Sequence, residues 1–506
     1  MKKIWILVIV TISVLTLSGC FNQTPVEEAE DPVIVDPNNP NLADEKLEFI
    51  DIYYLNDLHG AIEANDYNIG LSYIANFINT KRAANPNNTL LLAGGDMFQG
   101  SALSNYYQGL STVQIMNAMK FDAMVVGNHE FDWGIETVAN YFDESATTDK
   151  ATFPLLGANV VYEGTNDIVE NIKPYTIIQR QDTKIGIIGT MGYGLESSIA
   201  QSKIDGYEFK EPVNVVKTYT KELRNIHKVD VVIVVSHDPG AGLNSGLTGL
   251  TGEYKVDAIF NAHSHRESLE ITNSIPIIQS KANGERVGFV RIALSDKYKT
   301  ETINYKKSSD PLFNVEDPAV KALIDGYKAE TDTLFKEKII TNKSYIGRTE
   351  LTKWVAQVMM VKTNADIAFH NSGGTRVDFF DGESINLAKL YQVLPFDNVV
   401  KSVYLTGSQI NNLMYRSDLE YSKSVETFKS STLYKVTTND YVFDKDNDVF
   451  IGGTNPSNDG YVLRDIVQDE LLLQKEVYPY FETTNLLLTN QATLSFYNML
   501  TRDAIR

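Results

Sequence analysis

Short polar motifs that combine His, Asp and Asn recur through the first half of the chain. These residue types bind divalent ions through nitrogen or oxygen. The five motifs are Asp57-Leu58-His59, Gly94-Gly95-Asp96, Gly127-Asn128-His129-Glu130, Ser236-His237 and His263-Ser264-His265. Five of the seven histidines in the chain fall within them, whereas His227 and His370 lie outside and are expected to be structural. Such a set indicates hydrolytic chemistry assisted by metal ions.

Each motif follows an apolar run of the kind expected for a buried β-strand. The five runs are 49–55, 89–93, 121–126, 229–235 and 256–260, and 184–189 and 287–294 read as further strands. Amphipathic stretches at 70–82 and 111–119 alternate with them, which predicts an α/β domain. Ligands gather at the carboxyl ends of strands in such sheets, so we expect the motifs to meet in space.

The ligand types fit a pair of divalent ions, either zinc or manganese. An Asp carboxylate can bridge two ions, and two ions about 3.5–4 Å apart can polarise a phosphoryl group and activate a water molecule. Phosphoester hydrolysis is the reaction that this arrangement favours.

The ordered set of motifs resembles the 5'-nucleotidase family of calcineurin-like metallophosphoesterases over nearly the whole mature chain. The resemblance implies that a first ion is bound by Asp57, His59, Asp96 and His265, and a second by the shared Asp96 with Asn128, His237 and His263. It also implies that His129 and Asp132 are the catalytic pair, with the imidazole donating a proton and the carboxylate orienting the ring. Ala262 stands where the family usually has Gly.

Further family-like motifs lie in the second half of the chain. Asn371-Ser372-Gly373-Gly374-Thr375-Arg376 resembles the family's nucleotide-binding turn, which implies that Asn371 contacts base or ribose and Arg376 the phosphate. The segments around Phe396 and Tyr461 resemble those that sandwich the nucleobase, although residues 454–458 interrupt the second one. Arg348 stands near the position of a further family Arg, with a spacing one residue shorter.

The N-terminus has the anatomy of an export signal. Lys2 and Lys3 precede the apolar run 4–17, which ends in Leu17-Ser18-Gly19-Cys20 and resembles a bacterial lipoprotein signal. The run is short for a membrane-spanning helix. We therefore expect an exported protein, anchored on the outer face of the bacterial cell membrane through a lipidated Cys20.

The predicted organisation has five parts. They are the signal peptide 1–20, a flexible acidic and Pro-rich tether 21–46, a metallophosphoesterase domain 47–305, a linker with a bridging helix 306–338, and a nucleotide-specificity domain 339–506. The fold class is α/β. The resemblance implies a β-sandwich flanked by helices and joined by a helix to a smaller α/β substrate-binding domain.

Composition narrows the choice of partners. A formal net charge of -20 argues against binding of a nucleic-acid polymer, and a single cysteine rules out an internal disulfide framework. We expect a nucleotide substrate, membrane contact through the lipid only, and no obligate protein partner. The resemblance implies a 5'-nucleotidase, with UDP-sugar hydrolysis possible in the same site. The alternatives are a 2',3'-cyclic-nucleotide 2'-phosphodiesterase with 3'-nucleotidase activity, and a nucleotide-binding lipoprotein without turnover.

Overall fold

The computed structural model describes residues 47–422, 427–445 and 449–489, all within one compact unit, Glu45–Arg506. The predicted lipoprotein signal with Cys20 and the acidic tether lie outside the described residues. Within the described ranges, no helix combines the length and apolar character needed to cross a bilayer.

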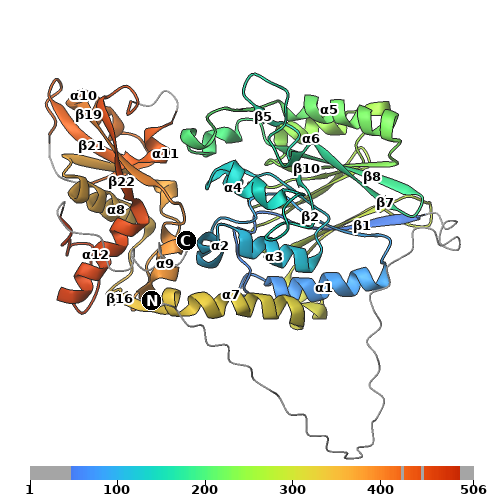
Figure 1. Ribbon diagram of the computed structural model, residues 1–506, viewed down its shortest axis with the longest axis horizontal. Helices are drawn as coiled ribbons and strands as arrows, with labels where there is room; N and C mark the ends of the chain where they lie inside the picture. The colour runs from blue at the N-terminus through green and yellow to red at the C-terminus, as the bar shows by residue number, and fades with distance from the viewer. Residues whose placement is uncertain (1–46, 423–426, 446–448, 490–506) are drawn as a thin grey trace, which may run out of the picture. The chain divides into compact units, whose positions relative to one another are not determined.

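A seven-stranded sheet forms the first layer of the N-terminal part (Figure 1). In spatial order its strands are β15 (Glu301–Tyr305), β14 (Val287–Ala293), β1 (Phe49–Leu55), β2 (Thr89–Ala93), β3 (Ala123–Val125), β4 (Leu155–Leu156) and β6 (Ile172–Lys173). β1, β2 and β3 run parallel, with Leu55 opposite Ala93 in the β1–β2 pair. Their carboxyl ends therefore lie along the same edge of the sheet.

A six-stranded sheet packs against the first. Its strands are β12 (Glu267–Thr272), β13 (Ile275–Ser280), β11 (Ala258–Phe260), β10 (Val231–His237), β8 (Thr183–Met191) and β7 (Tyr175–Arg180). Buried aliphatic and aromatic side chains from both sheets, such as Ile52, Val125, Ile187 and Phe260, form one core between them. This arrangement confirms the predicted β-sandwich, since burial of two apolar sheet faces against each other produces such a core.

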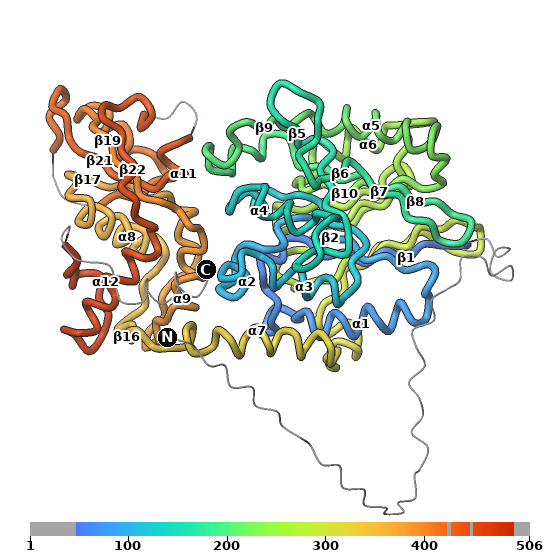
Figure 2. The backbone as a smooth tube through the Cα atoms, viewed as in Figure 1, coloured from blue at the N-terminus to red at the C-terminus, as the bar shows by residue number. Residues whose placement is uncertain are grey.

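Helices cover the outer faces of both sheets (Figure 2). The outer side of the first sheet is covered by α1 (Leu71–Ala84) and α3 (Leu110–Met119), and α7 (Pro318–Lys336) packs against these two helices. The second sheet is covered by α5 (Pro212–Glu222) and α6 (Ala241–Thr248). Smaller elements are α2 (Ala102–Tyr106), α4 (Ile135–Ala139), β5 (Val160–Tyr162) and β9 (Tyr207–Phe209). α7 begins with an Asp317 cap and leads into the C-terminal part.

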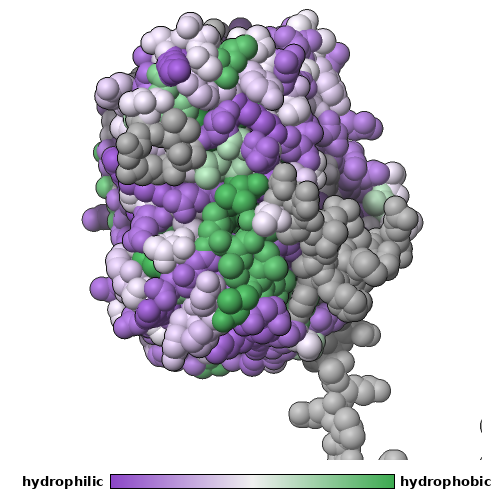
Figure 3. Space-filling view, turned by 90° about the vertical axis from the view of Figure 1, so that its left-hand side faces the viewer, coloured by the Kyte–Doolittle hydropathy of each residue, from purple (hydrophilic) through white to green (hydrophobic). Residues whose placement is uncertain are grey.

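The C-terminal part is a smaller α/β assembly, as the fold class predicts. Its main sheet has the order β20 (Leu419–Tyr421), β17 (Ile367–Asn371), β21 (Leu433–Asn439), β19 (Val399–Thr406) and β22 (Thr454–Val462), and β16 (Lys338–Thr341) pairs with β18 (Ser384–Asn386). The helices are α8 (Arg348–Thr363), α9 (Leu387–Val393), α10 (Gly407–Leu413), α11 (Asp440–Phe443) and α12 (Leu463–Val477). Figure 3 shows that hydrophilic side chains cover much of one face of the molecule, where apolar ones gather in a strip.

Candidate active site

The loops that carry the metal-ligand motifs have unusual backbone conformations. Asp57, His59, Asp96, His263 and His265 all have φ angles between 50° and 70°. Residues other than Gly rarely adopt this left-handed backbone conformation, and such backbone strain is found preferentially at functional sites. Five predicted ligands therefore sit in sharp turns just beyond the strand ends.

Glu130 ties two of these loops together. Its carboxylate accepts hydrogen bonds from the backbone N–H groups of Asp96 at 2.8 Å, Met97 at 2.9 Å and Gly127 at 2.7 Å. Burial, followed by the negative charge of Asp96, raises the pKa of Glu130 to about 7. A Cβ atom on Gly127 would collide with the Asp96 carboxylate, so this position requires glycine. Glu130 thus positions Asp96, a role that the sequence alone did not assign to it.

Asp57, His59 and His265 form one group of potential ligands. The Nδ1 atom of His59 contacts the carbonyl oxygen of Gln99 at 3.0 Å, which places the donor hydrogen on Nδ1. Its Nε2 atom lies 3.0 Å from Nε2 of His265, which lies 3.4 Å from Oδ1 of Asp57. Burial lowers the pKa of His59 to about 4, so the ring is neutral at pH 7 and presents a lone pair.

Asp96, His237 and His263 form a second group, completed by Asn128. His237 donates from Nδ1 to the carbonyl of Gly94 at 2.8 Å, so its Nε2 faces Asp96 Oδ2 and Asn128 Oδ1, each 3.1 Å away. Nδ1 of His263 lies 3.0 Å from the same Asn128 oxygen. This convergence of electron-donating atoms fits a cation.

The negative charge of Asp96 also favours a cation at the second ligand group. Burial disfavours a charged His237 ring, but the carboxylates of Asp96 and Asp57 outweigh it and raise the pKa of His237 to about 10. The surroundings of the His237 ring therefore strongly favour a positive charge. Asp96 also belongs to a third group of potential ligands with His59 and His129, so it lies between the two sets.

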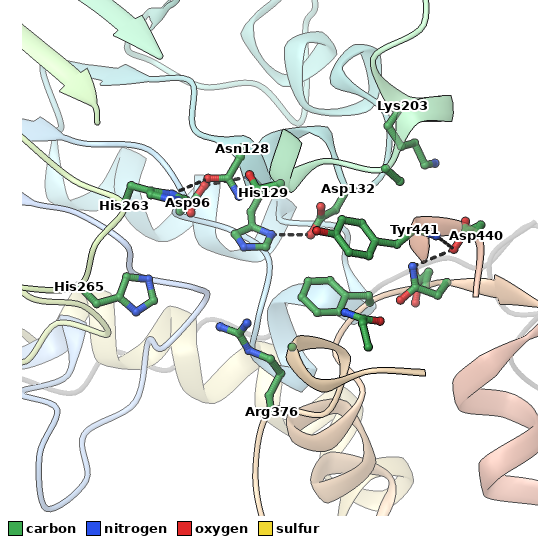
Figure 4. Close-up of a pocket in the computed structure, with 17 residues that line it drawn as sticks. Asp96, Asn128, His129, Asp132, Lys203, His263, His265, Arg376, Asp440 and Tyr441 are labelled. Atoms are coloured by element: carbon green, nitrogen blue, oxygen red, sulfur yellow. Dashed lines mark hydrogen bonds and ion pairs between the residues drawn. The ribbon is translucent and has the colours of Figure 1, made fainter. Parts of the chain in front are cut away.

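His129 and Asp132 form a close pair beside these groups (Figure 4). Nδ1 of His129 lies 2.9 Å from Oδ2 of Asp132, and the backbone N–H of His129 donates to Asp96 Oδ1 at 2.8 Å. Burial disfavours the charged ring, but Asp132 and Asp96 outweigh it and raise the pKa of His129 to about 9. The imidazole is therefore protonated at neutral pH, and its Nε2 is left for other contacts.

One cavity of about 310 Å³ adjoins the ligand groups. It is lined on one side by Asp96, Asn128, His129, Asp132, His263 and His265, and on the other by Asn371, Gly373, Arg376, Phe396, Asp397, Asn398, Asp440 and Tyr441. Ser198, Ala200 and Lys203 complete the lining. Figure 4 shows the two histidines His263 and His265 on the opposite side of the pocket from Tyr441 and Asp440. Residues from both halves of the chain thus share one pocket.

Three predicted substrate-binding residues, Asn371, Arg376 and Phe396, reach this pocket. Phe396 stacks on His129 with ring centroids 5.6 Å apart, and the Arg376 guanidinium lies 5.9 Å from the centroid of Phe396. Burial, followed by the charge of Arg348, lowers the pKa of Arg376. Arg348 is therefore close to the pocket, but it is not part of the lining; its backbone N–H donates to Asp378 at 2.8 Å.

Tyr461 lies elsewhere. Its ring packs beside the C-terminal core with Lys362 Nζ 4.9 Å from the ring centroid, and it does not appear in the described pocket lining. The pairing of β19 with β22 is irregular between Val399 and Lys401, opposite the segment that contains Tyr461. The predicted aromatic partner of Phe396 is thus not brought to the pocket in this structure.

Sequence reasoning missed Tyr441, Asp440 and Lys203 as pocket residues. Asn398 donates to Asp440 Oδ1 at 2.8 Å, and burial raises the pKa values of both Asp440 and Tyr441. The one local signal for the first two is the helix cap Asn439 that precedes them. Lys203 stands in a polar stretch without a recognisable motif.

Two family models match the chain: calcineurin-like phosphoesterase over residues 50–267, and 5'-nucleotidase, C-terminal domain, over residues 328–429. Protein UshA of Escherichia coli (strain K12) is 26% identical over 71% of this chain and 74% of its own length. The trifunctional nucleotide phosphoesterase protein YfkN of Bacillus subtilis (strain 168) is 26% identical over 75% of this chain. The crystal structure of a 5'-nucleotidase precursor from Thermus thermophilus has the same fold, with a TM-score of 0.69 and 21% identity over 88% of this chain and 98% of that one.

The chain spans only part of several curated relatives. The match covers 28% of YfkN, and it covers 63% and 32% of two further relatives. By contrast, it covers about three quarters of UshA and nearly all of the Thermus thermophilus structure.

Proposed function

Since the chain belongs to the 5'-nucleotidase family of calcineurin-like phosphoesterases, we propose that it removes phosphate from nucleotides by metal-assisted hydrolysis. The observation that carries this proposal is the composition of the cavity described above. It joins clustered metal-ligand candidates, a protonated His, an Arg and stacked aromatic rings within about 310 Å³. That volume is near the lower end of the range for small-molecule sites, which suits a mononucleotide.

Two divalent ions, zinc or manganese, would be held by two ligand sets. Asp57, His59, Asp96 and His265 form the first set, and Asp96, Asn128, His237 and His263 form the second, with Asp96 shared. When bound, such ions polarise the phosphoryl group and activate the attacking water. The neutral lone pair of His59 supports this assignment, as does the convergence of His237 Nε2, Asn128 Oδ1 and Asp96 Oδ2, with Nε2 lying 3.1 Å from each oxygen.

His129 acts as the proton donor in this proposal. Asp132 holds its Nδ1–H, so the proton on Nε2 is directed to the phosphoryl oxygen or to the departing oxygen of the nucleoside. The raised pKa favours the protonated ring at neutral pH, so a proton is available for donation. Proton donation by a positioned side chain typically contributes roughly 10²–10⁴-fold to the rate.

The C-terminal part binds the nucleotide. Arg376 grips the phosphate through its planar guanidinium, with Arg348 adding positive charge nearby. Phe396 offers one stacking face for the nucleobase, and Tyr441, rather than Tyr461, offers the second. Asn371 contacts the base or ribose. Stacking suits every base because each has a π-face.

We place this activity outside the cell. The N-terminal segment resembles a lipoprotein signal, so Cys20 becomes the lipid-bearing first residue and the acidic segment 21–46 tethers the catalytic part to the membrane. A relative from Listeria monocytogenes is named as a cell wall protein, which supports export. The protein therefore meets nucleotides present outside the cell.

The test is an assay of purified protein on AMP, 2',3'-cyclic AMP and a UDP-sugar, with and without manganese. We expect manganese-dependent release of phosphate from AMP, and loss of that activity on addition of a chelator. Hydrolysis of the cyclic nucleotide without hydrolysis of AMP would replace the proposal with the phosphodiesterase alternative. No turnover of any of them, with nucleotide still bound, would indicate a binding protein.

A further inference from the structure

Asn439 is the last residue of β21 and lies directly behind the nucleotide pocket. Its side chain is fully buried and does not appear in the described lining of the cavity. It makes three hydrogen bonds: Oδ1 accepts from the backbone N–H of Val442 at 2.8 Å, and Nδ2 donates to Nδ1 of His370 at 3.1 Å and to Oδ1 of Asn371 at 2.8 Å. Both hydrogens of the amide are therefore used.

The orientation of this amide is fixed by its backbone partner. A backbone N–H can only donate, so the atom of Asn439 that faces Val442 must be the oxygen. This contact caps the N-terminus of α11, where Asn is among the preferred residues. The nitrogen is consequently directed at His370 and Asn371. The usual ambiguity between the oxygen and nitrogen of an amide side chain does not arise here.

The protonation state of His370 supports the same orientation of the Asn439 amide, with Nδ2 facing His370. It is completely buried, and desolvation lowers its pKa to about 3, so the ring is neutral at pH 7 and Nδ1 accepts the hydrogen from Asn439. Gly374 lies against the ring, because a Cβ there would be only 2.6 Å from Cε1 of His370. The turn that carries Asn371 and Arg376 therefore packs against the His370 ring through Gly374.

These contacts determine what Asn371 presents to the pocket. Its Oδ1 is engaged by Asn439, so its Nδ2 is the atom left to meet a ligand. Asn371 and Gly373 both line the cavity, and Nδ2 of Asn371 lies on the Gly373 side of the turn, 3.7 Å from the ideal Cβ position of that glycine. Asn371 thus acts as a hydrogen-bond donor toward the pocket.

We propose that Asn439 is a positioning residue that sets the amide of Asn371 to donate to an acceptor on the nucleoside part of the substrate. Through its cap on α11, the same side chain holds Asp440 and Tyr441 at the wall of the pocket. This inference rests on the proposed function and deepens it. It requires that the base or ribose present an acceptor, such as a ring nitrogen or oxygen, at Asn371.

The test is the substitution Asn439→Asp. The carboxylate preserves the helix cap, since Asp caps as well as Asn, but it loses both donors. Asn371 must then turn its Nδ2 toward the new carboxylate and present its oxygen to the ligand. We expect the Kd of adenosine, measured by calorimetry on the manganese-loaded protein, to rise roughly tenfold or more, as loss of a hydrogen bond in a closed site does.

Kinetics separate this role from a structural one. KM for AMP should rise with little change in kcat, and kcat/KM for p-nitrophenyl phosphate, which has no nucleoside, should stay the same. Asn386→Asp is the matched control: Asn386 caps α9 by accepting the N–H of Lys389 at 2.9 Å, and the substitution adds the same charge. This control should bind adenosine like the wild type.

Three outcomes would overturn the inference. One is a wild-type Kd for adenosine in Asn439→Asp, the second is an equal loss with adenosine and p-nitrophenyl phosphate, and the third is a wild-type protein that binds no adenosine. Failure of the proposed function would give a different result: the protein would bind adenosine but would release no phosphate from AMP. In that case the calorimetric comparison of Asn439→Asp with Asn386→Asp still decides the inference.

Discussion

The ring of Phe396 lies nearly parallel to that of His129, with an angle of 18° between the planes and 5.6 Å between the centroids. Phe396 follows α9 in the C-terminal part, whereas His129 follows β3 in the sandwich. Asn105 donates to the carbonyl oxygen of Pro395 at 2.8 Å and so holds the loop that carries Phe396. The aromatic face for the substrate therefore begins directly beside the proposed proton donor.

Replacement of His129 by Ala tests that proton donor. We expect His129→Ala to lower kcat on AMP by roughly 10²–10⁴-fold, because proton transfer to the departing oxygen is lost. The metal content, measured by mass spectrometry, should be unchanged. His227→Ala is the control, since His227 is half-buried beside Tyr175 and Glu222 and does not line the described pocket. Wild-type activity of His129→Ala would remove the assignment.

Replacement of Asp96 by Asn tests the shared ligand. A neutral amide cannot balance two cations, so Asp96→Asn should bind fewer than two manganese ions per chain and lose activity at the same time. Asp238→Asn removes a carboxylate next to His237 that instead accepts the N–H of Gly240. That control should keep the wild-type metal content. Two tightly bound ions in Asp96→Asn would contradict a bridging role.

The choice between Tyr441 and Tyr461 is tested by a pair of Ala variants. Base stacking contributes about 1–3 kcal/mol, so Tyr441→Ala should raise KM for AMP roughly 5- to 150-fold and leave kcat/KM for ribose 5-phosphate, which has no aromatic ring, unchanged. Tyr461→Ala should leave KM for AMP near its wild-type value, because that ring packs against Lys362. The reverse pattern would restore Tyr461 as the second stacking residue.

Buried His370 should make stability depend on pH. Its folded pKa of about 3 lies below the ordinary 6.5, so the unfolded chain binds more protons between these values and stability falls as the pH falls. Above that window the contribution is constant. His370→Gln, which retains an acceptor for Asn439, should lose roughly 2 kcal/mol less unfolding free energy than the wild type between pH 6 and pH 4.

Urea denaturation of both proteins at pH 6, 5 and 4 gives this comparison. The other titrating groups are the same in both proteins. The difference between the two slopes of unfolding free energy against pH therefore reports His370 alone. Equal slopes would mean that His370 is protonated in the folded protein, or that it is exposed before the main unfolding transition.

Strand positions were predictable where apolar runs were short and bounded by polar motifs. The predicted runs 49–55 and 89–93 match β1 and β2, and the run 229–235 matches β10 with a shift that makes His237 its last residue. β13 was not predicted; it contains Pro276, a residue type that is rare within central strands, yet all six of its residues are buried. The pairing of β13 with β11 and β12 on either side decides that segment instead.

The metal-ligand candidates were predictable because each follows a strand directly, so local sequence and parallel topology together place it. The pocket wall formed by Asp440 and Tyr441 was not predictable from the sequence. Its position depends on the cap residue Asn439, whose other contacts, His370 and Asn371, are almost seventy residues earlier in the chain. Tyr461 was assigned from the linear order of motifs. The pairing of β22 with β19 is irregular at this segment, which no local pattern reveals, and the Tyr461 ring lies beside Lys362.

We propose that the two ligand sets hold two divalent ions that serve hydrolysis of a nucleotide. A titration of metal-free protein with manganese, in which bound ions per chain and phosphate release from AMP are followed together, decides whether they do. We predict that activity appears only as occupancy approaches two ions per chain. Full activity without metal or with one ion, or two bound ions without phosphate release from AMP, would show that the two ligand sets do not act as a two-ion hydrolytic centre.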